Sequence, residues 1–249
     1  MPEGRLWQSD ECSKPYSVYE IMNKGLEGED MFSPSRDILD YWERYYGSTT
    51  DYRIMPSQFA AFMIGEIGSR RQIIDVGCGS GRDALFFAHC GHDVIGIDAA
   101  ANAIEICRQK AEQVDARTAR FLHSRIDDDG LLQQVLAQAT PGLPTLVYAR
   151  FFLHAITDAQ EKTFFDLCSA LAKADGLVAV EFRTMRDAQQ HKETPDHYRR
   201  FINPLDVLSA ARAHGFLLQY FVEGFGYAKY RADDAHVARC LFAHDSVAP

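Results

Sequence analysis

The chain has 249 residues, of which 47% are hydrophobic and 24% are charged, and its formal net charge is −9. This composition is typical of a folded globular protein, and the negative charge disfavours nucleic acid as a partner because an acidic surface repels phosphate backbones. The six cysteines form no C-x-x-C pair, which argues against a disulfide framework or a metal site. The sequence has no apolar leader and no apolar run of 18 residues, so we expect a cytoplasmic protein with no role at a membrane.

The length fits one α/β core with an appended cap, and we assign residues 1–69 to an N-terminal arm and helical cap. Residues 1–16 are polar and predict an extended lead-in. The apolar spacing then predicts three helices, at residues 18–26, 37–46 and 56–67, with Ser35 before the second and Gly68 after the third. Tyr45, Tyr46 and Arg53 form an aromatic and basic cluster just before the core. The aromatic residues either line a site or bury one helical face.

Residues 70–249 alternate between strand and helix patterns, which predicts a parallel sheet covered by helices on both faces. The predicted strands are residues 73–76, 92–98, 119–124, 145–150, 177–182, 216–222 and 235–243. The predicted helices are residues 82–90, 102–113, 131–139, 158–173 and 204–215. The last two strands are joined without room for a crossover helix, so the final strand should be antiparallel. The fold class is therefore α/β, with a seven-stranded Rossmann-like sheet.

A glycine-rich turn follows the first core strand, in the run Asp75-Val76-Gly77-Cys78-Gly79-Ser80-Gly81. Glycines at alternate positions let the backbone approach a ligand, and the next helix offers unpaired N–H groups. The dinucleotide pattern G-x-G-x-x-G is not met, because Arg82 stands where its last glycine would be. The next strand ends in Asp98, an acid placed to receive two ribose hydroxyls.

These two motifs resemble those of class I S-adenosylmethionine-dependent methyltransferases of the small-molecule type. The resemblance implies S-adenosyl-L-methionine as cofactor, with S-adenosyl-L-homocysteine as product. The implied cofactor contacts are Asp75, Gly77, Cys78, Gly79, Gly81, Asp98, Ala99, Ile126, Arg53 and Tyr46. Asp75 either binds the cofactor amino group through water or fixes the glycine loop. Ile126 packs on the adenine beside Asp127, or the three aspartates at 127–129 simply begin the next helix, where negative charge suits the dipole.

The acceptor side is predicted from the residues after the fourth and fifth strands. Ala149-Arg150-Phe151-Phe152 stands where enzymes that methylate DNA bases or a glutamine amide carry an N-P-P-Y-like tetrad, which argues against those substrates. Arg150 and His154 are the candidate catalytic residues, with His154 either a general base for a hydroxyl or a structural histidine.

Arg183, Arg199, Arg200 and Tyr45 are the candidate substrate-binding residues, and an acceptor-site insertion is predicted near residues 184–203. Arginine forks suit carboxylate or phosphate oxygens, although a solvated loop is the alternative. The predicted reaction is methyl transfer to a small, anionic metabolite or sugar-type acceptor, at oxygen. An NAD-dependent oxidoreductase and a non-catalytic cofactor-binding module are the alternatives.

Overall fold

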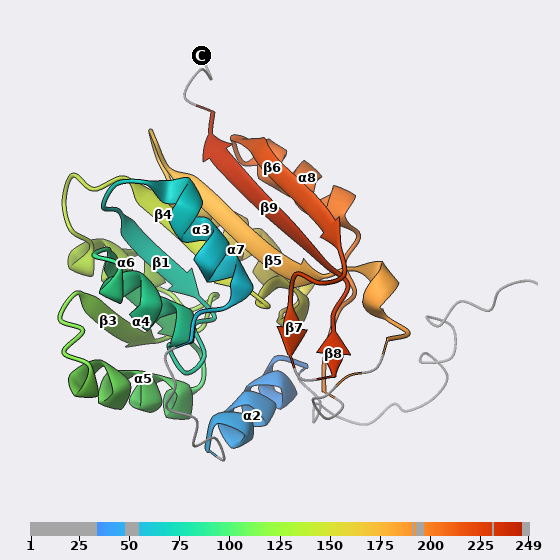
Figure 1. Ribbon diagram of the computed structural model, residues 1–249, viewed down its shortest axis with the longest axis horizontal. Coiled ribbons are helices and arrows are strands. Elements are labelled where there is room, and N and C mark those ends of the chain that lie inside the picture. Colours follow the sequence, from blue (N-terminus) through green and yellow to red (C-terminus); the bar gives the residue numbers. More distant parts are fainter. Residues whose placement is uncertain (1–33, 48–54, 191, 193–196, 231, 246–249) are drawn as a thin grey trace, which may run out of the picture. The chain divides into compact units, whose positions relative to one another are not determined.

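The structure is a computed structural model that describes residues 34–47, 55–190, 192, 197–230 and 232–245. The predicted arm, the predicted helix at residues 18–26 and Arg53 lie outside the described residues. The centre is a seven-stranded sheet of order β3-β2-β1-β4-β5-β9-β6 (Figure 1). Its strands are β1 (Gln72–Val76), β2 (Asp93–Asp98), β3 (Ala119–His123), β4 (Thr145–Arg150), β5 (Leu177–Arg183), β6 (Phe216–Gly224) and β9 (Val237–His244).

The strands β1 to β5 are parallel to one another, and β9 runs antiparallel between β5 and β6. The predicted fold class and the antiparallel final strand are therefore confirmed. The connection from β6 to β9 holds only a two-stranded hairpin, β7 (Lys229–Tyr230) and β8 (Asp233–Asp234). This hairpin was not predicted from the sequence, because two-residue strands have no periodicity.

Helices cover both faces of the sheet. One face packs on α3 (Gln58–Ile67), α4 (Arg82–His89) and α5 (Ala101–Gln113), and the other on α6 (Leu131–Gln138), α7 (Asp158–Leu171) and α8 (Pro204–Ala213). Neighbouring strand residues therefore enter different cores: Ile73 packs with the first set of helices and Ile74 with the second. Because both faces are buried, the central strands read as continuous apolar runs.

The helix starts follow local hydrogen-bonding chemistry. The helix predicted from residue 56 begins at Gln58, because the Ser57 hydroxyl accepts a hydrogen bond from Ala60 N at 3.0 Å and so caps it. The predicted capping box of Thr157 and Gln160 is present at the start of α7. The helix α6 begins after Gly130 and has no side-chain cap, so the preceding aspartates do not serve it in that way.

One end of the sheet gathers the remaining elements. The helix α2 (Pro34–Gly47) and the β7–β8 hairpin both lie at the end toward which β1, β4 and β5 point (Figure 1). Two short 3-10 helices, η1 (Leu153–Ala155) and η2 (Met185–Asp187), directly follow β4 and β5. Ligands of open α/β sheets bind at this carboxyl end. No helix among the described residues has the length and apolar character needed to cross a membrane.

Candidate active site

The glycine loop at residues 77–81 joins β1 to α4 and is held against β2. The N–H groups of Gly77 and Cys78 donate to the carbonyl oxygen of Ile97 at 2.8 and 3.0 Å. Gly77 has φ +73°, and a Cβ atom there would lie 2.6 Å from Cδ2 of Phe152. Gly79 has φ +54°, and a Cβ atom there would lie 2.2 Å from the hydroxyl oxygen of Tyr46. The loop is thus a backbone-lined cradle, with one aromatic ring packed against each of these glycines.

Asp98 ties the end of β2 to this cradle. Its Oδ2 accepts a hydrogen bond from Gly79 N at 2.8 Å, and its Oδ1 accepts one from Ala100 N at 2.9 Å. Burial raises the pKa of Asp98, and the two N–H donors partly oppose that rise. A carboxylate has about four lone-pair sites, so two remain for a ligand. The next residue, Ala99, presents its carbonyl to Nε2 of His123 at 3.0 Å.

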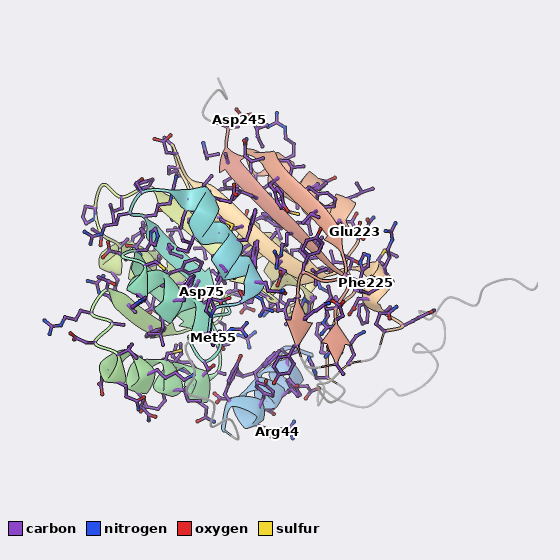
Figure 2. All side chains as sticks on the ribbon, viewed as in Figure 1. Arg44, Met55, Asp75, Glu223, Phe225 and Asp245 are labelled. Carbon is purple, nitrogen blue, oxygen red and sulfur yellow. The ribbon has the colours of Figure 1, made fainter. Side chains whose placement is uncertain are left out.

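Asp75 is buried within β1 below the cradle (Figure 2). Its Oδ2 has no hydrogen-bond partner in the described part of the chain. Burial raises the pKa of Asp75 well above its ordinary range, and the nearby Asp83 and Asp98 raise it further. Because a buried carboxyl oxygen without a partner is costly, the site is suited to a cationic group such as the ammonium of an amino-acid moiety.

Arg150, at the end of β4, lies in a chain of buried charges. Its Nε is 2.8 Å from Oε1 of the fully buried Glu181, whose Oε2 accepts a hydrogen bond from Arg239 Nε at 2.7 Å. The Arg150 guanidinium stacks on the ring of Phe151 at 4.3 Å. No hydrogen bond of its two Nη atoms occurs among the described residues. The contacts of Glu181 with Arg150 and Arg239 were not predicted from the sequence, because only the fold brings these residues together.

His154 lies in η1 and is buried beside β5. Its Nδ1 accepts a hydrogen bond from the backbone N–H of Arg183 at 3.2 Å. In a neutral imidazole only one nitrogen carries a proton, so this bond assigns the proton to Nε2. Nε2 is then a donor and has no lone pair for a substrate proton. The geometry therefore favours a hydrogen-bond donor over the general base considered from the sequence.

The stability of the protein should report this state of His154. Burial lowers the pKa of His154 well below its ordinary value, and Arg183, Arg199, His197 and Arg150 lower it further. The unfolded chain thus takes up this proton first as the pH falls below about 6.5, and folding stability drops with a slope of at most about 1.4 kcal/mol per pH unit. Above that pH the stability contribution of the neutral ring is fully present.

The variant His154→Asn should remove that dependence, because an amide oxygen can still accept from Arg183 N but does not titrate. Urea unfolding of both proteins between about pH 7.5 and 5.5 measures the effect. We expect the wild type to lose stability relative to the variant as the pH falls. A difference that stays constant over this range would contradict the buried neutral imidazole.

The candidate substrate-binding arginines separate into two groups. Arg183 forms ion pairs of 2.6 Å with both Asp187 and Asp233, and Arg200 is paired with Asp158 and Glu161 of α7. Arg183 thus joins η2 to β8, and Arg200 joins the segment after β5 to α7. In the structure Arg183 and Arg200 therefore connect the segments that surround His154, a role that the sequence did not predict.

Arg199 lies in a different setting. Its Nη2 is 3.2 Å from Nε2 of His197, whose ring stacks on Tyr41 of α2 at 4.0 Å. Burial lowers the pKa of Arg199, and the neighbouring Arg183 lowers it further. Tyr41 was not among the candidates from the sequence, whereas Tyr45 was, and Tyr45 packs edge-on against Trp42 and Tyr46. The run of aromatic residues in α2 was the signal for both.

The region after β3 is a loop held by its own aspartates. Ile126 is buried in the core formed with α6 and α7. Asp128 accepts hydrogen bonds from Ser124 Oγ at 2.9 Å and from Arg125 N at 2.7 Å, and Asp127 accepts one from Gln160 Nε2 at 3.2 Å. These aspartates fold the loop that follows β3. A cofactor contact of Ile126 remains a prediction.

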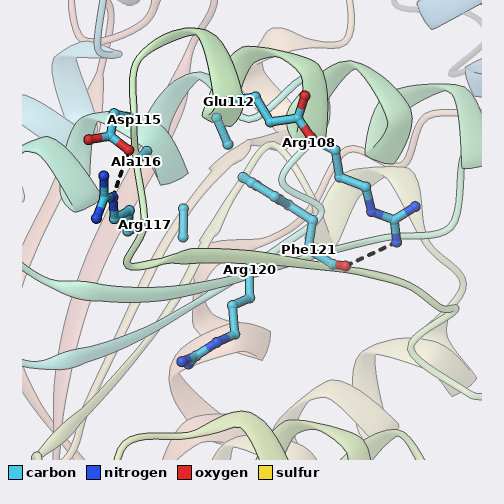
Figure 3. Close-up of a pocket in the computed structure, with 9 residues that line it drawn as sticks. Arg108, Glu112, Asp115, Ala116, Arg117, Arg120 and Phe121 are labelled. Carbon is cyan, nitrogen blue, oxygen red and sulfur yellow. Dashed lines mark hydrogen bonds and ion pairs between the residues drawn. The ribbon is translucent and has the colours of Figure 1, made fainter.

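A hollow of 340 Å³ lies away from this site, between α5 and the edge strand β3 (Figure 3). Its charged lining is already engaged, since Arg117 pairs with Asp115 at 2.8 Å and Arg108 donates to the carbonyl of Phe121 at 3.3 Å. It therefore adds nothing to the candidate active site. No group of His, Cys, Asp or Glu suited to a metal ion occurs among the described residues.

The seven-stranded sheet, the glycine cradle and the acid at the end of β2 together define a class I methyltransferase architecture. Residues 73–176 match the family model of a methyltransferase domain. This match, together with the fold, supports a methyltransferase enzyme. This finding goes against the NAD-dependent alternative.

Solved structures with a similar fold include an S-adenosylmethionine-dependent methyltransferase from Anabaena variabilis, with a TM-score of 0.62 and 16% identity over 86% of this chain and 96% of that one. The CcbJ methyltransferase from Streptomyces caelestis has a TM-score of 0.60 and 14% identity, covering 84% and 98% of the two chains. A TehB-like methyltransferase from Corynebacterium glutamicum gives 0.55 and 17%, covering 84% and 97%. These identities show a shared fold alone. No curated protein matches the chain.

Proposed function

We propose that the enzyme methylates an oxygen atom of a small anionic metabolite or an anionic sugar-type acceptor. The observation that carries this proposal is the gathering of cations around His154 in a chain of net charge −9. Arg150 and Arg199, together with His197, lie close enough to lower the pKa of His154. A site with this gathering of positive charge favours a carboxylate or phosphate.

The cofactor in this proposal lies along the carboxyl ends of β1 and β2. Asp75 would take its ammonium group, the backbone of residues 77–81 would cradle its methionine part, and Asp98 would take its ribose hydroxyls. Tyr46 would cover the loop at Gly79. Bound there, the cofactor supplies an electrophilic methyl group, and the chain's own residues hold the acceptor in line with it. The division into a cap at residues 1–69 and a core at residues 70–249 belongs to the same proposal.

An anionic acceptor also suits the protonation state of His154. Where the attacked oxygen is itself ionised, as in a carboxylate or phosphate, it needs no general base before it attacks a methyl group. His154 would then use its Nε2–H to orient the acceptor, and the Nη atoms of Arg150 would pair with its negative charge. Excluding water and fixing this geometry would supply most of the rate.

The variant Arg199→Gln tests the proposal. A hydrogen bond to a charged group contributes about 1.5–3 kcal/mol, so we expect the KM for an anionic acceptor to rise about tenfold or more, with the KM for S-adenosylmethionine unchanged. The assay follows radiolabelled methyl transfer to a panel of carboxylates and phosphates, each paired with its neutral amide or hydroxyl analogue.

The matched control is Arg120→Gln, on the exposed side of β3, where the guanidinium donates to the carbonyl of Gln138 and to no other group among the described residues. That variant should behave like the wild type. Equal turnover of anionic and neutral analogues by the wild type would contradict an anionic acceptor. Methylation of a nitrogen in the accepted compound would contradict transfer to oxygen.

A further inference from the structure

The first turn of α5 receives its cap from a distant part of the chain. Its own N-cap residue, Ala100, has no side-chain group to accept a hydrogen bond. Instead, the carboxylate of Glu43 on α2 accepts from Ala101 N at 2.6 Å and from Asn102 N at 3.0 Å. A negative charge at this position satisfies two orphan N–H groups and complements the helix dipole.

The contact is reciprocal. The side chain of Asn102 donates from Nδ2 to the backbone carbonyl of Glu43 at 3.1 Å. At the end of α2, a Cβ atom on Gly47 would lie 3.3 Å from the same Nδ2, so the two helices approach closely. Three hydrogen bonds thus fasten the middle of α2 to the start of α5. We call this set of contacts between Glu43 and residues 101–102 the clasp.

The helix that carries the clasp also supports the glycine cradle. The Sγ of Cys107 donates to the carbonyl of Gly79 at 3.1 Å, and the Nζ of Lys110 donates to the carbonyl of Ser80 at 3.3 Å. At its N-terminal end, α5 follows Asp98 within three residues. The helix α5 is therefore a rigid link between α2, the cradle and the acid at the end of β2.

The docked position of α2 covers the same place. Tyr46, one turn after Glu43, packs its hydroxyl against Gly79. Burial raises the pKa of Tyr46 well above its ordinary value, and the charge of Asp98 raises it further. A ligand held by Gly79 and Asp98 could leave by this side only if Tyr46 and α2 move away.

We propose that Glu43 is a positioning residue whose clasp holds α2 closed over the cofactor and so limits the rate at which S-adenosylhomocysteine leaves. This inference rests on the placement of the cofactor proposed above. Breaking the clasp should leave the cradle in place, because Cys107 and Lys110 hold it independently. Loss of the clasp should make both α2 and the first turn of α5 more mobile.

The test compares Glu43→Ala with the control Glu105→Ala. Glu105 lies on α5, and in the described part of the chain its carboxylate accepts a hydrogen bond from Gln109 alone, at 2.9 Å. Amide hydrogen exchange at Ala101 and Asn102, measured without ligand, reads the clasp directly. Stopped-flow displacement measures the dissociation rate of S-adenosylhomocysteine, with Trp42 of α2 as the fluorophore in a Trp7→Phe background. Loss of a helix cap typically changes an equilibrium about fivefold, so we expect about fivefold faster exchange and release.

The expected result is faster exchange at both amides and faster release in Glu43→Ala, with Glu105→Ala unchanged. Asn102→Ala should give the same direction of change. Unchanged release in Glu43→Ala would overturn the proposal, as would an effect confined to the association rate. If the wild type binds no S-adenosylhomocysteine, the cofactor placement fails and retention fails with it, whereas the amide exchange still decides whether Glu43 caps α5.

Discussion

Gly77→Ala is expected to weaken S-adenosylmethionine binding by at least about 30-fold while the chain still folds. Gly77 has φ +73°, a left-handed conformation that costs a side-chain-bearing residue about 1–2 kcal/mol. The new Cβ would also lie 2.6 Å from Cδ2 and 3.2 Å from Cβ of Phe152. Phe152 packs on the main core and cannot turn aside, so the loop must move, at a further cost of about 1–3 kcal/mol.

Gly142→Ala is the matched control, because Gly142 has φ +81° and nothing within 4 Å of its added Cβ. In urea unfolding both variants should show a lower free energy of unfolding, because both place a side chain at a positive φ. In calorimetry only Gly77→Ala should show a weaker affinity for S-adenosylmethionine. The difference between them isolates the close packing of the cradle. Wild-type affinity in Gly77→Ala would show that the cofactor does not lie on this loop.

Glu181→Gln is expected to lower the free energy of unfolding by about 3–5 kcal/mol, the cost of removing one partner from a buried ion pair. Glu181 is fully buried between Arg150 and Arg239. Its neutralisation leaves two guanidinium groups in the interior with no carboxylate between them. Because Arg150 borders the acceptor side, methyl transfer should fall as well.

The comparison for this variant is Glu223→Gln on the neighbouring strand β6. Glu223 is partly exposed, and the basic side chains of His236 and Arg186 are 3.7 and 3.9 Å away. A surface pair of this kind contributes about 0–1 kcal/mol. Urea unfolding of the two variants therefore separates burial from the mere loss of a carboxylate. Similar losses in both would show that Glu181 is not a buried charge centre.

The sheet could be predicted because its signals are local. The strands β1, β2, β4 and β5 are largely apolar, and glycines follow the ends of α4 (Gly91), α7 (Gly176) and α8 (Gly215). Caps such as Thr157 with Gln160 act within four residues. The start of α3 shifted from the predicted Pro56 to Gln58, because the Ser57 side chain caps the helix.

The roles of charged side chains could not be predicted in the same way, because they depend on partners far along the chain. Arg183 meets Asp233 across 50 positions, and Arg200 meets Asp158 across 42. The fold brings these partners together, so the positive charges that the sequence suggested for substrate binding are paired with carboxylates of the protein itself. His154 gives the same lesson, since its tautomer is assigned by a backbone N–H on another strand.

The place of β9 inside the sheet has a consequence for synthesis of the protein. Residues 237–244 pair with β5 on one side and β6 on the other, so neither neighbour has its partner until this stretch has left the ribosome. Until then β6 exposes both of its edges, along with the apolar side chains of Leu217, Leu218 and Phe221, which stay partly exposed even after folding. Unpaired edges of this kind are aggregation-prone in nascent chains. Completion of the sheet at β5 and β6 therefore waits for the synthesis of β9.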